Sequence, residues 1–309
     1  MYNEETKMEY LNQMPMQSAK KVLLTVFNSD LGYEDYFGKD LCNFTEPEIL
    51  EFFIAWDSIA FESLNTKCSL LRSYTQWCIE HNLSNDNINH YDSITRENLL
   101  SCLNKTKYEQ KYISLEELKN ICDSVVNVRD QALCYCIFFG IYGKEGEDLR
   151  ELTAQCINLD TGHIKLLNGR EFDVPVWVAK ILHDSCETYE YISYNANGNV
   201  FEMSLKEDDP TVFKARNNSS VATMAVFKKR ISRILSLIGK EMSCPAITAK
   251  RLRNSGIVYH LKNYMMENNL DAENMYYEDY TGEIMEKYGL QYPIGLANFN
   301  MKYGSFLKK

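Results

Sequence analysis

The sequence predicts a mainly α-helical protein with one small three-stranded antiparallel β-meander. Along most of the chain, apolar residues recur at spacings of three and four, which is the period of a helix with one buried face. Clear alternation of apolar residues, the signal of a half-buried strand, occurs between positions 157 and 176. With 309 residues, the chain is also long enough for two domains that each have a core.

Residues 1–103 predict a small all-helical domain. Thr45, with Glu48 three residues later, forms a capping box that opens a helix with a buried apolar stripe. The next helix carries its apolar residues on one face and leaves two bases, Lys67 and Arg72, on the other. These bases are either solvated or available to a polyanion, and the sequence favours neither reading.

A polar stretch rich in lysine, residues 104–113, is predicted to link this domain to a second domain at residues 114–309. A second capping box, from Ser114 to Glu117, marks the start of that domain. The helix at 132–142 is apolar on nearly every side, so we expect it to lie at the centre of the second core.

The meander is predicted next along the chain. Apolar positions alternate from Ile157 and again from Ile164, with a turn between them. Asn168-Gly169 is a strong two-residue hairpin turn that leads into the last strand. That strand ends at Pro175, which opens an amphipathic helix through Glu187.

After a turn at 195–198, the chain is predicted to be irregular up to Arg216 and helical from there on. The first of these helices has a core face made of apolar residues at alternating spacings of three and four: Met224, Phe227, Ile231, Ile234 and Ile238. Its opposite face carries Lys229 and Arg233. A further helix begins near Thr248.

Charge is strongly segregated along this last part of the chain. The whole protein has a net charge of -10, but residues 214–262 hold eleven Lys or Arg and a single acid, Glu241. Residues 263–286 hold seven acids and no base. The basic block predicts an electropositive surface that binds phosphates, or else a solvated helix face that pairs with acids. The acidic block is either a partner surface or an intramolecular cover for the basic one.

Composition excludes several classes of protein. No run of about 18 apolar residues exists, and the N-terminus is acidic and polar, which argues against a membrane partner and a secretory signal. The ten cysteines are scattered in apolar company without CxxC spacing. We therefore expect reduced core thiols in a cytoplasmic protein, with no metal site and no cofactor.

A helical domain, a Lys-rich linker, two helices, a meander and further helices occur in this order in tyrosine recombinases (phage integrases). The segment ITAKRLRNSG at 247–256 resembles the recombinase segment T-x-H-x-L-R-H-T. GIYGKEGEDLREL at 140–152 is similar to the t-G-l-R-i-s-E-l segment. The resemblance covers nearly the whole chain, and it implies a helical core-binding domain followed by a catalytic-like domain.

The resemblance also implies a catalytic set, and this set is depleted here. Recombinases use two arginines to neutralise the scissile phosphate, Lys and His to handle protons, and a C-terminal Tyr as nucleophile. The corresponding positions are Glu145, Leu167 (with Lys165 in the neighbouring register), Lys250, Arg253 and Tyr303. Losing one such group commonly slows a reaction about 10²- to 10⁴-fold, so we expect no enzymatic activity. The alternative to a nucleophilic role for Tyr303 is that its side chain packs in the core.

Within this superfamily, the chain resembles the master repressor family of SPβ-like temperate phages, MrpR or YopR. The opening MYNEETKMEYLN, the helix SLLRSYTQWCIEHN and the pair RLRNSGIVYHLKNYM and EIMEKYGL carry this resemblance. It implies a sequence-specific repressor that maintains lysogeny by occupying double-stranded operator DNA in the bacterial cytoplasm. A divergent active integrase that uses Tyr303 and a protein–protein adaptor are the alternatives. A regulatory protein or peptide is a further candidate partner.

The candidate DNA contacts are the bases of the last helices and of the linker. Lys250, Arg251 and Arg253 together are the strongest candidates. Lys250 and Arg253, three apart, share one helical face. The complete set is Lys250, Arg251, Arg253, Lys228, Lys229, Arg233, Lys214, Arg216, Lys105 and Lys107. For each of these bases the alternative is a solvated side chain, and His260 is expected to be a surface residue outside the motif.

Overall fold

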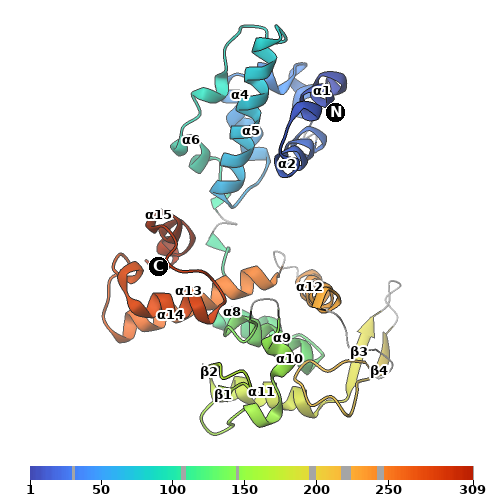
Figure 1. Cartoon of the computed structure of the whole chain (residues 1–309), viewed down its shortest axis with the longest axis vertical. Coiled ribbons are helices and arrows are strands. Elements are labelled where there is room, and N and C mark those ends of the chain that lie inside the picture. Colours follow the sequence, from blue (N-terminus) through green and yellow to red (C-terminus); the bar gives the residue numbers. More distant parts are fainter. Residues whose placement is uncertain are drawn as a thin grey trace. The chain divides into compact units, whose positions relative to one another are not determined.

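The computed structural model divides the chain into two compact units, Met1–Lys111 and Tyr112–Lys309 (Figure 1). Each unit has its own apolar core. The division falls inside the stretch that the sequence assigns to the linker. The structure describes residues 1–29, 32–105, 109–143, 146–194, 200–216, 224–241 and 247–308.

The first unit is helical throughout its described part. Thr45 and Glu48 form the predicted capping box at the start of helix α4, which spans Glu46–Ala55. The long helix α5 (Phe61–Glu80) lies at the centre of this core and buries the apolar face expected of it: Leu64, Cys68, Leu71, Tyr74 and Cys78. Around it lie α1 (Glu4–Gln13), α2 (Gln17–Asn28), α3 (Tyr33–Phe37), α4 (Glu46–Ala55) and α6 (Arg96–Ser101).

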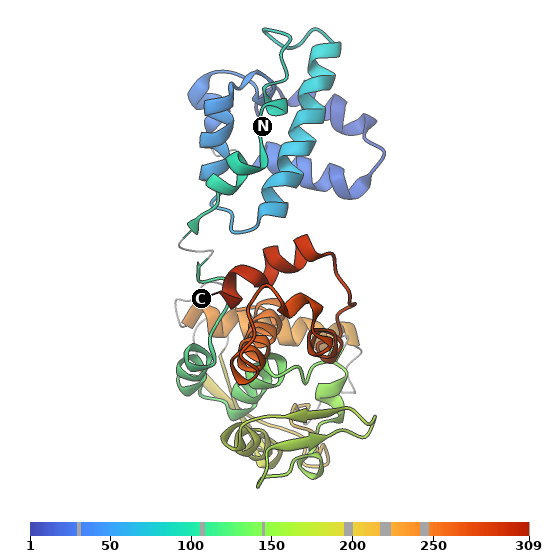
Figure 2. The same cartoon turned by 90° about the vertical axis from the view of Figure 1, so that its left-hand side faces the viewer.

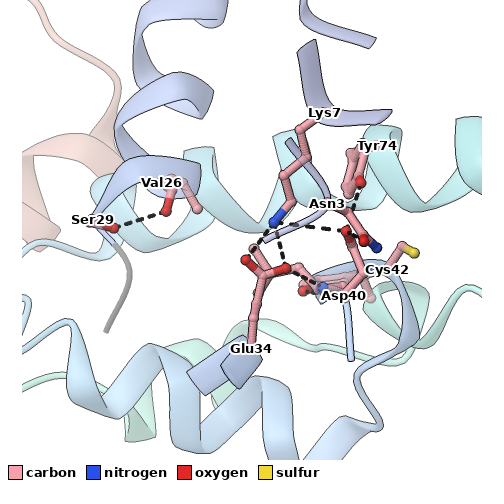
Figure 3. A network of polar contacts seen from close by, with 10 residues as sticks. Asn3, Lys7, Val26, Ser29, Glu34, Asp40, Cys42 and Tyr74 are labelled. Atoms are coloured by element: carbon pink, nitrogen blue, oxygen red, sulfur yellow. Dashed lines mark hydrogen bonds and ion pairs between the residues drawn. The ribbon is translucent and has the colours of Figure 1, made fainter. Parts of the chain in front are cut away.

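A buried ionic network ties the start of the first unit to its centre (Figure 3). The fully buried ammonium of Lys7 contacts the Glu34 carboxylate and lies 3.8 Å from Asp40 Oδ2. The Tyr74 hydroxyl donates to Asp40 Oδ2 at 3.2 Å, and the Leu41 amide donates to Glu34 Oε1 at 2.9 Å. Burial raises the pKa of Glu34 to about 7. Removing Lys7 would leave two carboxylates buried without their cation, which commonly costs about 3–5 kcal/mol.

The second unit is built around α9 (Val128–Phe138), whose residues from Ala132 onward are all buried, as the sequence predicts. Helices α11 (Val176–Glu187) and α13 (Ala249–Glu267) pack against it. In turn, α14 (Asp279–Lys287) and α16 (Ser305–Leu307) pack against α13 (Figure 2). The remaining helices are α8 (Leu115–Asp123), α10 (Asp148–Glu151), α12 (Met224–Glu241) and α15 (Leu296–Phe299). The mainly helical, two-domain prediction is confirmed.

The β structure differs in detail from the predicted meander. Strands β1 (His163–Lys165) and β2 (Glu171–Asp173) form the expected antiparallel hairpin, with Ile164 opposite Phe172. The predicted first strand contributes a single antiparallel bridge, from Ile157 to Ile164. Because Ile157 directly follows a 3-10 turn, the chain does not stay extended long enough there to form a full strand.

A second hairpin pairs β3 (Glu190–Tyr194) with β4 (Val200–Ser204). Strand β3 lies between the predicted helix and the predicted turn, where the sequence indicated no element, and β4 lies in the stretch predicted to be irregular. Its strand β4 is largely exposed, so its sequence lacks the alternation that marks a half-buried strand. The hairpin is instead anchored to the start of α9. The amide of Asn127 exchanges two hydrogen bonds with the backbone of Ile192, at 3.0 and 2.8 Å.

Helices α9 and α13 approach each other closely at Gly256. A Cβ atom at this position would lie 1.7 Å from the Phe138 carbonyl oxygen and 2.3 Å from the Tyr288 hydroxyl. The same Phe138 carbonyl accepts a hydrogen bond from the Tyr288 hydroxyl. Only glycine fits at this crossing, and it lies within the motif segment 247–256.

We predict that Gly256→Ala destabilises the protein by at least about 2 kcal/mol, because the added methyl group must push α13 away from α9. Urea unfolding followed by circular dichroism measures this change. Gly295→Ala is the matched control, since a Cβ at Gly295 meets no atom within 4 Å and its φ of -56° suits alanine. Equal unfolding midpoints for the two variants would contradict the close approach.

Candidate nucleic-acid interface

The two basic helices predicted from the sequence pack against each other in the second unit. Helix α12 buries Ile231, Ile234 and Ile238, which confirms this part of its predicted core face. Lys229 and Arg233 are exposed. Lys228 belongs to α12, but its side chain lies outside the described residues, as do those of Met224 and Phe227.

Helix α13 begins with a side-chain cap, in which the Thr248 hydroxyl accepts a hydrogen bond from the Arg251 amide at 3.1 Å. Lys250 is exposed beside this cap, and Leu252 is fully buried on the core side. Arg251 is partly exposed and engaged within the chain.

Arg253 is partly buried, and its Nε atom has no hydrogen-bond partner among the described residues. A donor removed from water without an acceptor is unfavourable, by about 1–3 kcal/mol. A phosphate oxygen is an acceptor that suits the guanidinium group. The environment of Arg253 therefore fits an external anion, whereas a simple surface arginine would already be hydrated.

Tyr303 lies next to the retained arginine motif. Its side chain is 1% exposed, and its hydroxyl donates to Asn254 Oδ1 at 3.3 Å. Burial raises the pKa of Tyr303 to about 12, against an opposing effect from the charge of Arg253. The structure thus brings together two retained positions of the predicted catalytic set, Arg253 and Tyr303, but it holds the phenol inside the protein.

The end of the linker is fastened to the same helix. The Ile113 amide donates to Ser255 Oγ at 2.9 Å, and the Ser255 hydroxyl donates to the Arg251 carbonyl at 2.8 Å. The Tyr112 hydroxyl donates to the Lys302 carbonyl at 2.7 Å, and its ring stacks on Tyr303. Sequence reasoning did not assign a role to Tyr112 or Ser255. Only the position of Ser255 inside the motif segment could have indicated one.

Lys214 does not belong to the interface, which corrects the prediction. Its side chain is buried, with 1% exposure of the residue, and its ammonium donates to the Asp209 carbonyl at 2.8 Å and lies 5.0 Å from the centre of the Tyr189 ring. The loop after β4 folds back on itself here and uses this cation as an internal donor. Arg216 has an exposed side chain and is engaged within the chain.

The candidate bases of the first unit and of the linker differ in their surroundings. Lys105 is exposed, and Lys107 lies outside the described residues. Lys67 stacks over the Trp56 ring at 4.6 Å, and burial lowers its pKa. Arg72 donates to the Tyr91 carbonyl at 2.7 Å and pairs with an aspartate. Lys67 and Arg72 therefore have partners within their own unit.

The remaining positions of the predicted catalytic set are only partly covered by the structure. Glu145 lies outside the described residues, and Leu167 is 86% exposed in the β1–β2 turn. Lys165 Nζ is paired with Glu171 Oε1 at 2.6 Å. Among the described residues, no group of His, Cys, Asp and Glu could hold a metal ion.

His260 is not the surface residue that the sequence predicts. Its Nε2 atom is buried and has no hydrogen-bond partner in the described part of the chain, and its ring packs against Phe139 and Tyr288. Burial lowers its pKa to about 3, so the imidazole is neutral at pH 7. The prediction failed because α14 covers this turn of α13, which the spacing of residues in α13 alone does not reveal.

The cysteines of the described part are buried and unpaired, in agreement with their apolar sequence neighbours: Cys42, Cys68, Cys78, Cys102, Cys122, Cys134, Cys136, Cys156 and Cys186. No helix in the described ranges combines the length and the apolar character needed to cross a membrane.

Comparison with known proteins places both parts of the chain in one family. The family model described as MrpR, C-terminal catalytic domain, matches residues 112–302, and the model described as MrpR, N-terminal core-binding domain, matches residues 1–80. The SPbeta prophage-derived uncharacterized protein YopR of Bacillus subtilis (strain 168) is 24% identical over 304 residues, which cover 94% of this chain and 92% of YopR. The crystal structure of XerA recombinase aligns with a TM-score of 0.41 at 14% identity, over 97% of this chain and 92% of that chain.

We predict that Lys214→Met lowers the free energy of unfolding by about 1–3 kcal/mol, because it leaves the partly buried carbonyl oxygens of Asp209 and Thr211 without this donor. Lys250→Met, at an exposed site, should change it by less than about 0.5 kcal/mol. Urea unfolding of the two variants measures the difference. A larger loss for Lys250→Met would show that the loop around Asp209 does not hold Lys214 in solution.

Proposed function

The chain belongs to the MrpR family, and on this premise we propose that it is a sequence-specific DNA-binding repressor of a temperate phage. It maintains lysogeny in the bacterial host cell by occupying operator sites in double-stranded DNA, and it has no recombinase activity. The observation that carries the proposal is the set of bases on α12 and α13. Lys229, Arg233 and Lys250 are exposed, and Arg253 has a donor that meets no acceptor within the ranges that the structure describes.

Electrostatics support DNA as the partner despite the net charge of -10. Phosphate contacts depend on local charge, because salt screens charges that lie more than about 10 Å apart. Two packed helices from one basic block concentrate cations over a small part of the second unit. Such a surface would hold the duplex backbone, while side chains at the helix start would contact base edges.

The burial of Tyr303 supports the absence of recombinase activity. A nucleophile must reach the scissile phosphate, and the Tyr303 hydroxyl is instead directed at Asn254. Its raised pKa also disfavours the phenolate. The hairpin position for a proton-donating lysine is Leu167, which has no ionisable group. One observation favours the alternative of an active recombinase, namely that Arg253 and Tyr303 remain neighbours.

We predict that Arg253→Ala weakens operator binding by about tenfold or more, because a guanidinium contact to phosphate or guanine is lost. Lys250→Ala should weaken binding and lower the slope of log Kd against log salt concentration by about one, as expected for a single phosphate contact. Fluorescence anisotropy at several salt concentrations measures both effects.

Lys180→Ala is the matched control, since Lys180 is an exposed base on α11, outside the basic block. It should bind the operator as the wild type does. Wild-type affinity and salt dependence in both the Lys250 and Arg253 variants would show that α13 does not contact DNA.

The proposed function is tested directly by incubating purified protein with sheared DNA from its source genome. The retained fragments are then sequenced before and after an SDS wash. We expect discrete fragments that SDS releases, because a repressor binds its operator without a covalent bond. Fragments that survive SDS in the wild type but not in Tyr303→Phe would establish a covalent phosphotyrosine and therefore an active recombinase. Failure to retain any fragment would favour the protein–protein adaptor.

A further inference from the structure

A cavity of about 610 Å³ opens near the C-terminal helices of the second unit. One wall is the segment after α13, with Glu273 and Tyr277, and the other is the helical run at 296–308. The Tyr277 ring is 70% exposed and Leu296 is 39% exposed, so apolar surface is available at the rim. A volume in this range accommodates one or two side chains of a bound peptide.

The surroundings of the cavity are acidic. It borders the block at 263–286, which has seven acids and no base. Asp271, Glu273 and Asp279 are exposed there. This charge repels nucleic acid and attracts a cationic ligand. The exposed Tyr277 ring also presents a face on which an ammonium or guanidinium group can stack.

Glu273 already binds a cation of its own chain. Lys308 Nζ lies 2.8 Å from Glu273 Oε1, and the pair joins the two walls of the cavity. Both side chains are mostly exposed, and ion pairs in such a position are weak because water and salt screen them. A cation supplied by another molecule can therefore replace Lys308 without a large penalty.

The wall formed by 300–305 is also connected to the DNA-binding helix. Asn300 and Gly304 line the cavity and belong to one π-helical turn, an element that is often found at functional sites. Tyr303 lies in the same turn, and its hydroxyl contacts Asn254 in α13. A ligand that displaces this wall would therefore shift the contact next to Arg253.

We infer that this cavity binds a protein segment in which a lysine or arginine is adjacent to an apolar side chain, and that its occupancy changes the affinity of α13 for DNA. The cation binds Glu273 in place of Lys308, and the apolar side chain packs against Tyr277 and Leu296. The regulatory half of this inference rests on the proposed function, whereas the binding half does not.

The binding half is tested with the full chain and an array of short peptides that contain every pair of Lys or Arg with Leu, Phe or Tyr. A parallel array has Glu in place of each base. We expect cationic peptides to bind in preference to their Glu counterparts, and Glu273→Lys to weaken the best peptide by about tenfold or more through repulsion. Tyr277→Ala, which removes an exposed ring without adding charge, should also weaken it.

Glu283→Lys is the matched control, because Glu283 is an exposed acid of the same block but does not line the cavity. It should change peptide affinity by less than about threefold, as a screened distant charge does. Equal losses for Glu273→Lys and Glu283→Lys would show a non-specific charge effect and overturn the site. The absence of any preference for cationic peptides over the Glu array would overturn it as well.

The regulatory half is tested by measuring operator affinity with and without a saturating concentration of the best peptide. We expect a change of about fivefold or more, the lower range of typical coupling between two sites. An unchanged affinity would overturn the coupling while the peptide site stands. If the chain binds no DNA even without peptide, the proposed function fails. The peptide-binding measurements can still be interpreted in that case, because they do not depend on DNA.

Discussion

The second unit depends on the close contact between α13 and α9 at Gly256. The Phe138 carbonyl oxygen occupies the space that any larger residue would need, and the Tyr288 hydroxyl closes the crossing from the other side. Because protein cores are close-packed, this contact leaves α13 little freedom to slide or rotate. The side chains of the preceding turn are therefore held at defined positions relative to the central helix.

That single turn of α13 contacts three other parts of the second unit: its core, the C-terminal run and the end of the linker. Leu252 packs into the core, and Arg253 carries the unpartnered donor. Asn254 binds Tyr303 of the C-terminal run, and Ser255 binds the end of the linker through Ile113. These contacts are all made within four consecutive residues of one helix.

Buried cations show that charge in the sequence is not equivalent to charge on the surface. Lys7 in the first unit and Lys214 in the second are both buried and serve as internal hydrogen-bond donors. Arg129 is also buried, with its guanidinium 3.9 Å from the centre of the Tyr191 ring. Each of these bases organises a loop or hairpin around itself. Exposed bases such as Lys229 and Lys250 remain for an external partner.

The sequence by itself determined the elements whose signals are local. The capping boxes at Thr45 and Ser114 follow from spacings within a few residues, and they appear as predicted. The same holds for the described part of the buried face of α12, namely Ile231, Ile234 and Ile238. The motif segments were also sufficient to indicate the family. Only the tertiary structure decided the burial of Lys214, the β3–β4 hairpin, the covered position of His260 and the contact between Tyr303 and Asn254. The reason is that these features depend on atoms from distant parts of the chain. Tyr303 and Asn254, which are in contact, are 49 residues apart in the sequence, and Ile113 and Ser255 are 142 residues apart.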